Sequence, residues 1–380
     1  MKNFSPPRRL QGIEKSLIRQ VFDRALPGSL NLGLGEPDLP TPDVVREAAI
    51  RVIREEQNGY TSHPGLPALR EKIAGEYEYL NGDRERVIVT AGSQEALYLA
   101  LLSIVDEGDE VLLPNPGFVA YPTIVQMAGG RAVFYELPAA QDFSFDIESF
   151  RRALTPRTRA VVCISPSNPT GRVLSKDDLA AIADALKDHD AYLISDEIYR
   201  ELYYDAERPA SATSFHDRTI VISGLSKSMS MTGWRLGWIC GEPSVIKTAL
   251  VLHGYVTTCA SAVSQKASLA AWSHEAESAR AGFRKIFKTR RDHLLDLIKT
   301  QLDLSAVTPD GAFYTMVDVS KYGSSMEVAE ALLQERLITV PGSAFGSQGE
   351  GFLRVSFCAD LDLLSEGVQR MRKAFVNRES

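Results

Sequence analysis

From residue 41 to residue 245, short apolar segments rich in β-branched residues alternate with segments of helical periodicity. Each apolar segment is continuous, which is typical of strands that are buried on both faces of a sheet. We therefore predict an α/β fold in which helices cover both faces of a mostly parallel sheet. Ligands of such sheets bind in the loops at the carboxyl ends of the strands. The predicted strands span residues 87–90, 110–114, 131–137, 160–166, 191–196, 219–224 and 236–241.

Capping residues mark the start of two intervening helices. Thr41 precedes a proline, and we expect its hydroxyl to cap the helix that follows. Ser175, with Asp178 three residues later, predicts a second helix N-terminus. Two further helices are expected directly after strands, at residues 93–105 and at about residues 118–127.

The pattern changes in the C-terminal third of the chain. Residues 262–301 have the periodicity of a long helix, which we expect to be broken near residue 280. Short strands mixed with two amphipathic helices follow, which indicates a smaller α+β domain. The predicted division is a large domain over residues 41–285 and a small C-terminal domain over residues 286–380. Residues 1–40 are expected to join the small domain or a partner subunit.

Composition limits the partners that the chain can have. It has 42 basic and 49 acidic residues, a net charge of −7, and so lacks the basic character of a nucleic-acid-binding protein. No stretch approaches the ~20 apolar residues of a membrane span, and residues 1–15 have no apolar run typical of a secretory signal. Four cysteines lie far apart, which favours free, buried thiols in a reducing compartment. We expect a cytoplasmic protein that binds neither nucleic acid nor a membrane.

The segment SGLSKSMSMTGWRLGW, residues 223–238, contains the most informative pair of residues. Lys227 follows a predicted strand among small residues, and Arg235 lies eight positions later. A lysine amine can form a Schiff base with a carbonyl cofactor, and an arginine can bind a phosphate through two N–H groups. A lysine after a loop is most often simply solvated, so this pair needs support from elsewhere in the chain.

Three segments at the ends of other predicted strands provide that support. TAGSQEAL (90–97) opens a helix with a glycine–hydroxyl turn, and a helix N-terminus is suited to bind a phosphate. SDEIY (195–199) brings Asp196 to the sheet edge, where it could pair with a protonated pyridine nitrogen or only cap a helix. SPSNPTG (165–171) is a polar turn in which Asn168 could donate to a phenolic oxygen.

Together these segments resemble the class I/II pyridoxal-5′-phosphate (PLP)-dependent aminotransferases of PLP fold type I. The resemblance is closest to the bacterial aspartate, alanine and aromatic aminotransferases, and it covers essentially the whole chain. It implies a large domain with a mostly parallel, mixed sheet and a smaller α+β domain. Three more segments in the same order contribute to it: NLGLGEPDLPTP (31–42), GYTSHPGLPALREKIA (59–74) and RVSF (354–357).

The resemblance implies three catalytic residues. Lys227 would carry PLP as a Schiff base and, once freed, move a proton as a general acid and base. Asp196 would keep the pyridine nitrogen protonated. Tyr199 and Asn168 would bind the phenolic oxygen, which favours its ionised form.

The resemblance also assigns binding residues. Phe118 would stack on the cofactor ring, and Tyr60 would reach a phosphate in the partner subunit, so that a homodimer shares its active sites. Arg354 would bind the substrate α-carboxylate with two parallel bonds, beside a backbone contact from Gly35 and near Asn168. No metal is expected. The phosphate-binding residues would be Gly92, Ser93, Gln94, Ser226 and Arg235.

The implied activity is transfer of an amino group between an L-amino acid and a 2-oxo acid, by a ping-pong mechanism with 2-oxoglutarate as the expected acceptor. The preferred donor stays open. Relatives that prefer dicarboxylates can carry a lysine at the position of Gln94, and residues 253–265 depart from the usual Ser/Asn/Pro-rich segment. Two alternatives also stay open: a cystathionine-type β-lyase, because fold does not determine reaction type, and a non-catalytic PLP-binding sensor domain.

Overall fold

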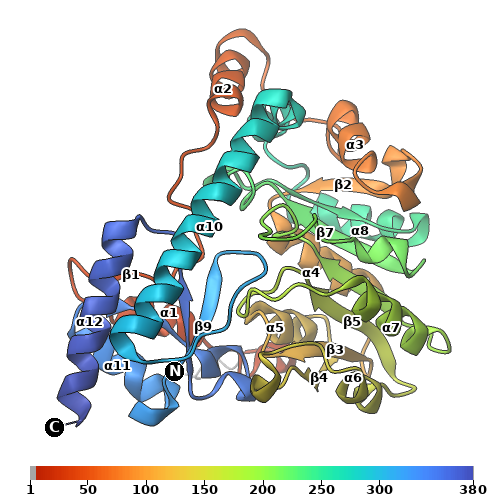
Figure 1. Cartoon of the computed structure of the whole chain (residues 1–380). Helices are drawn as coiled ribbons and strands as arrows, with labels where there is room; N and C mark the ends of the chain where they lie inside the picture. Colours follow the sequence, from red (N-terminus) through yellow and green to blue (C-terminus); the bar gives the residue numbers. More distant parts are fainter. Residues whose placement is uncertain (1–5, 380) are drawn as a thin grey trace, which may run out of the picture.

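In the computed structural model, which describes residues 6–379, the main sheet has seven strands in the order β2-β8-β7-β6-β5-β3-β4 (Figure 1). Only β8 runs antiparallel to its neighbours, β2 and β7, and the remaining pairs are parallel. The mostly parallel sheet predicted from the sequence is therefore confirmed. The strands are β2 (Val87–Thr90), β3 (Glu110–Asn115), β4 (Arg131–Glu136), β5 (Thr158–Ile164), β6 (Tyr192–Asp196), β7 (Thr219–Gly224) and β8 (Gly237–Cys240).

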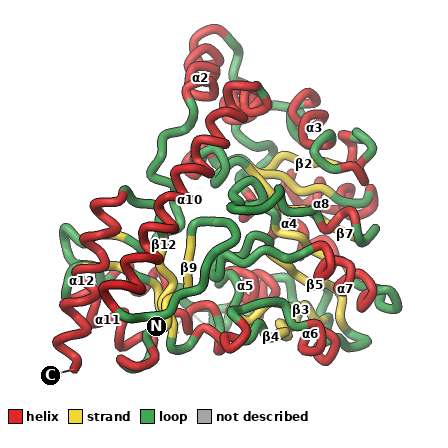
Figure 2. Tube along the Cα trace, viewed as in Figure 1, coloured by secondary structure: helices red, strands yellow, loops and turns green. Residues whose placement is uncertain are grey.

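Helices cover both faces of this sheet, as its continuous apolar strands require (Figure 2). On one face, Val111, Ile194 and Ile222 share a hydrophobic cluster with helices α4 (Ser93–Ile104), α5 (Ala120–Met127) and α8 (Pro243–Val256). On the opposite face, Val161 and Leu193 pack with helices α6 (Ile147–Ala153) and α7 (Lys176–Leu186). Val89 and Trp238 pack near helices α2 (Asp43–Glu55), α3 (Pro67–Ala74) and α9 (Ala262–Ser268).

A smaller group of strands lies beside the long helix α10 (His274–Leu302), which Figure 1 shows crossing the molecule. Strands β11 (Val340–Pro341), β12 (Phe352–Ser356) and β9 (Tyr314–Asp318) form an antiparallel sheet. The N-terminal strand β1 (Leu30–Asn31) pairs in parallel with β10 (Leu337–Ile338). Helices α1 (Leu17–Asp23), α11 (Ser325–Gln334) and α12 (Leu361–Glu379) complete this part.

Two local predictions were wrong. The break in the long C-terminal helix falls at residues 269–273, because Ser273 accepts the Ala276 N–H and so caps α10, and α10 then continues without interruption through residue 280. Thr41 does not cap α2, which follows Pro42 without a side-chain cap. The Thr41 hydroxyl instead donates to the Ser230 carbonyl and accepts from the Trp234 indole.

Other expectations were met in whole or in part. Ser175 and Asp178 form the predicted capping box at α7. All four cysteines are free thiols, but Cys259 and Cys358 are only half-buried. Over residues 6–379, we find no helix with both the length and the apolar character that crossing a membrane demands.

Candidate active site

The carboxyl ends of the parallel strands open into a cavity of about 300 Å³. Asp196 ends β6, Lys227 follows β7, and Ser93 begins α4 directly after β2. Arg354 enters from β12, on the smaller sheet. Eleven of the residues predicted for the site line this cavity: Gly35, Ser93, Gln94, Phe118, Asn168, Asp196, Tyr199, Ser226, Lys227, Arg235 and Arg354.

Lys227 lies half-buried in the cavity wall. Its Nζ donates to the Gly35 carbonyl at 2.6 Å and lies 5.9 Å from the centre of the Tyr199 ring. Burial lowers the pKa of Lys227 to about 8, and the positive charges of Arg354 and Arg235 act in the same direction. A neutral amine, the nucleophilic form, is therefore accessible near neutral pH.

Asp196 is buried and receives hydrogen bonds from two neutral donors. The Tyr121 hydroxyl donates to Oδ2 at 2.9 Å, and the Ile198 N–H donates to Oδ1 at 3.2 Å. Burial raises the pKa of Asp196 to about 6, although both hydrogen bonds oppose that shift. The carboxylate is suited to pair with a cationic group that enters the cavity.

The turn that leads into α4 is a candidate anion-binding site, which we call the anion cup (Ala91 to Gln94, with Arg235). No side chain caps α4, whose N-cap is Gly92 at φ +87°, so no side-chain cap occupies the first N–H groups of the helix. The first two residues of α4, Ser93 and Gln94, line the cavity. A Cβ at Gly92 would collide with the guanidinium of Arg235. That guanidinium donates to the carbonyls of Thr232 at 2.9 Å and Ala91 at 3.3 Å.

Arg354 is a buried cation with an incomplete set of hydrogen bonds. Its Nη1 donates to Asn168 Oδ1 at 2.8 Å, and its Nη2 donates to the Gly33 carbonyl at 2.5 Å. Its guanidinium lies 4.4 Å from the Tyr314 ring centre and 4.7 Å from that of Phe345. Within residues 6–379, the buried Nε has no partner. This arrangement suits a carboxylate, which can accept two parallel bonds from an arginine.

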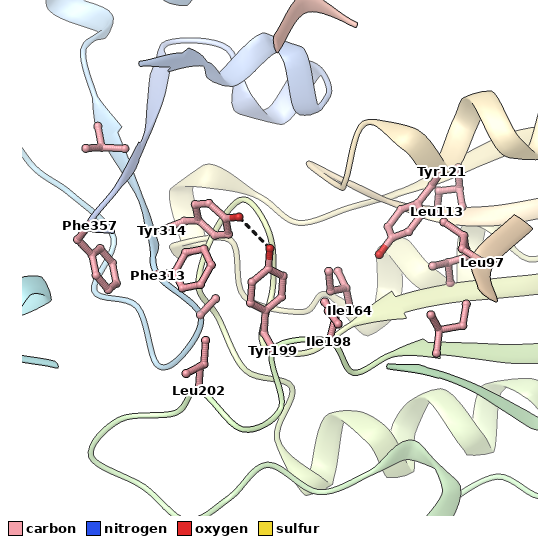
Figure 3. Packing of buried hydrophobic residues seen from close by; sticks show 14 of the residues in the cluster. Leu97, Leu113, Tyr121, Ile164, Ile198, Tyr199, Leu202, Phe313, Tyr314 and Phe357 are labelled. Carbon is pink, nitrogen blue, oxygen red and sulfur yellow. Dashed lines mark hydrogen bonds between the residues drawn. The ribbon is translucent and has the colours of Figure 1, made fainter. Parts of the chain in front are cut away.

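Two tyrosines of the site were not predicted from the sequence. Tyr314, on β9, lines the cavity, and its hydroxyl lies 2.8 Å from that of Tyr199 (Figure 3). Tyr121, the donor to Asp196, packs edge-to-face against Phe118. Its position three residues after Phe118, at the start of a helix, is the only sequence signal that could have identified it.

Two predicted residues lie outside the cavity lining. Gly92 is the N-cap of α4 and belongs to the anion cup, but it does not line the cavity. Tyr60 is 89% exposed in the loop between α2 and α3 and does not line the cavity of its own chain. Its predicted contact with a partner subunit stays a prediction.

The fold and the cavity define an enzyme of the α/β type, with a lysine, a carboxylate and two arginines at the strand ends. The model of the family described as aminotransferase class I and II matches residues 27–371. The chain therefore belongs to the class I and II aminotransferases, and the resemblance inferred from its motifs is confirmed. It is a PLP-dependent transaminase, which moves an amino group between an L-amino acid and a 2-oxo acid.

Relatives with different substrates are similar to this chain along their whole length. A probable aspartate aminotransferase of Methanocaldococcus jannaschii is 35% identical, covering 97% of this chain and 99% of the relative. Aromatic-amino-acid aminotransferase 2 of Thermococcus litoralis is 33% identical, covering 98% of each chain. The structure of Thermus thermophilus aspartate aminotransferase with maleate has a TM-score of 0.92 at 36% identity, covering 98% of this chain and 100% of that one.

Proposed function

We propose that Lys227 binds PLP covalently in this cavity and that the surrounding residues carry out transamination. The observation that carries this proposal is the convergence on one cavity of Lys227, Asp196, Arg235 and Arg354, which are distant in the sequence. Two features support the fit of the cofactor. The anion cup offers uncapped helix N–H groups beside an arginine, and Asp196 is a buried carboxylate with only neutral donors.

In this proposal each part of the cavity holds one part of PLP. The anion cup and Ser226 hold the phosphate, because helix N–H groups and a guanidinium both favour a dianion. Asp196 pairs with the protonated ring nitrogen, and Phe118 stacks on the ring face. Tyr199 and Asn168 hold the phenolic oxygen. Bound PLP supplies an electron sink for the bond electrons of the substrate α-carbon.

The protein residues then orient the substrate and move one proton. Arg354 binds the α-carboxylate, with Gly35 and Asn168 beside it, and so fixes the direction of the Cα–H bond. With substrate in place, the amine of Lys227 would accept the α-proton as a general base and donate a proton again as a general acid. The low pKa of Lys227 supports this role, because a neutral amine is needed to accept the proton.

The substrate proposal is limited to two points. We propose 2-oxoglutarate as the amino acceptor. The donor is an L-amino acid, and the relatives are named for aspartate and for aromatic amino acids. A panel of donors with 2-oxoglutarate held constant measures the preference directly.

We further propose a cytoplasmic homodimer in which Tyr60 reaches the phosphate of the partner subunit. Tyr60 is 89% and Tyr255 is 91% exposed. Large side chains this exposed support the proposal that the partner subunit covers this surface. Co-expression of Tyr60→Phe with Lys227→Ala tests this point: a shared site predicts recovered activity in mixed dimers, because one site is then fully wild-type.

The division into a large domain over residues 41–285 and a small domain over residues 286–380, with residues 1–40 joining the small domain or the partner, is part of the same proposal.

The test of the proposed function is a visible absorption spectrum of the PLP-loaded protein. We expect a Schiff-base band that is absent in Lys227→Ala and that is lost, with release of a 2-oxo acid, when a good amino donor is added alone. Pyruvate and ammonia released from a cysteine conjugate without any 2-oxo acid would instead indicate the β-lyase reaction. A band that shifts when an amino acid binds, without release of a 2-oxo acid, would favour the sensor domain.

A further inference from the structure

His253 is a fully buried histidine outside the cavity that the proposed function does not use. It lies near the end of α8. Its Nδ1 lies 2.8 Å from Glu95 Oε1. Glu95 is the third residue of α4, the helix whose N-terminus forms the anion cup. This pair therefore connects α8 to the base of the cup.

The carboxylate of Glu95 extends the connection to the backbone of the cup. Its Oε2 accepts the N–H of Ala91, and its Oε1 also accepts the hydroxyl of Thr257. The carbonyl of Ala91 accepts from Arg235 at 3.3 Å. Because the N–H and the carbonyl of Ala91 belong to different peptide planes, both planes that flank this residue are held. The second plane leads directly into Gly92.

The environment of His253 indicates which proton it carries. Its Nε2 is buried and has no hydrogen-bond partner within residues 6–379. The ring of His63 stacks on the ring of His253, with ring centres 5.6 Å apart and planes at 24°. Because a carboxylate oxygen only accepts hydrogen bonds, the proton of the contact between Nδ1 and Glu95 lies on Nδ1. His253 is then a donor to the Glu95 carboxylate.

We infer that His253 and Glu95 are positioning residues for the phosphate of the cofactor, an inference that rests on the proposed function. His253 and Thr257 fix the Glu95 carboxylate, and Glu95 fixes the Ala91 peptide. That peptide in turn holds Arg235 and the N-terminus of α4 in the orientation that a phosphate needs. Neither His253 nor Glu95 touches the cavity, so they act only through the cup.

The experiment compares PLP with pyridoxal, which forms the same Schiff base but lacks the phosphate. Both are titrated into the apoprotein and followed by visible absorption. The affinity for PLP divided by the affinity for pyridoxal measures the contribution of the phosphate. In His253→Leu, we expect this ratio to fall about tenfold, while the affinity for pyridoxal stays close to that of the wild type. His253→Asn should keep the ratio, because its amide nitrogen can occupy the position of Nδ1 and donate to Glu95.

Two further variants complete the test. His216→Leu is the matched control, since His216 also has a buried Nε2 without a described partner but lies away from the cavity; it should leave the ratio unchanged. Thr257→Val removes one donor to the same Glu95 oxygen and should also lower the ratio. This variant replaces His253→Leu in the test if His253→Leu does not fold.

The outcomes separate this inference from the proposed function. An unchanged ratio in folded His253→Leu, or equal losses for PLP and pyridoxal, overturns the positioning role and leaves the function standing. An unchanged ratio in Thr257→Val overturns it in the same way. A wild-type protein that forms no Schiff base with either compound overturns the proposed function itself.

Discussion

The hydroxyls of Tyr199 and Tyr314 lie 2.8 Å apart, and this contact connects the turn after β6 of the main sheet to β9 of the smaller sheet. Burial raises the pKa of Tyr199 well above its usual range, so its hydroxyl stays protonated at working pH. When Tyr199 donates to the phenolic oxygen of bound PLP, Tyr314 can donate to Tyr199. Donors in such a chain strengthen one another.

Tyr314→Phe should therefore raise the pKa of the cofactor Schiff base. Without the hydroxyl of Tyr314, Tyr199 becomes a weaker donor and the ionised phenolic oxygen is less favoured. We expect the midpoint of the visible pH titration to rise by up to ~1 pH unit, which corresponds to ~1.4 kcal/mol. A midpoint equal to that of the wild type would show that Tyr314 has no influence on Tyr199.

Replacing Arg354 should weaken substrate binding and leave cofactor binding intact. Arg354→Leu removes two charge-assisted bonds to the α-carboxylate, so KM for the amino donor should rise by about 100-fold. Arg354→Lys keeps the charge but loses the fork geometry of the guanidinium, so its KM should lie between those of the wild type and Arg354→Leu. Steady-state kinetics checks the order of the three proteins, with the visible spectrum as the control for bound PLP. A normal KM in the leucine variant would exclude this role.

The rate at which the apoprotein captures PLP should depend on the pKa of Lys227. Because that pKa is lowered to about 8, the fraction of neutral amine rises with pH and is nearly complete above that value. The rate should therefore reach half of its maximum at about pH 8 and level off about one pH unit above that. Stopped-flow absorbance measures it. A rate that keeps rising to about pH 10, where an ordinary lysine titrates, would contradict the lowered pKa.

Asp196→Asn should stabilise the apoprotein above pH 6 but weaken the binding of PLP. The pKa of Asp196 is raised to about 6, so the folded state binds this proton more tightly than the unfolded chain does. The resulting stability is present at low pH and is lost as pH rises from about 4 to about 6, at a cost of up to ~3 kcal/mol. Thermal melts at pH 8 should give a higher Tm for the variant without PLP and a lower one with PLP. A lower Tm in both states would contradict the buried, uncompensated charge.

Local sequence patterns predicted the main sheet, because the residues of each strand are close in sequence, and the resemblance to a known family assigned most of the cavity residues. The long-range contacts were not predictable in this way. Thr41 has the residue type of a cap, but its hydroxyl forms hydrogen bonds with Ser230 and Trp234, which lie far along the chain. Tyr314 entered the site because β9 packs opposite Tyr199, a tertiary relationship that no local pattern in GAFY encodes.

The covalent position of PLP tests the central claim most directly. The protein is loaded with PLP, reduced with borohydride to fix the Schiff base, digested, and mapped by mass spectrometry. We predict that the reduced cofactor is found on the peptide that contains Lys227, with labelling lost in Lys227→Ala. Stoichiometric label on a different lysine, with Lys227 unmodified, would contradict the assignment of this cavity as the active site.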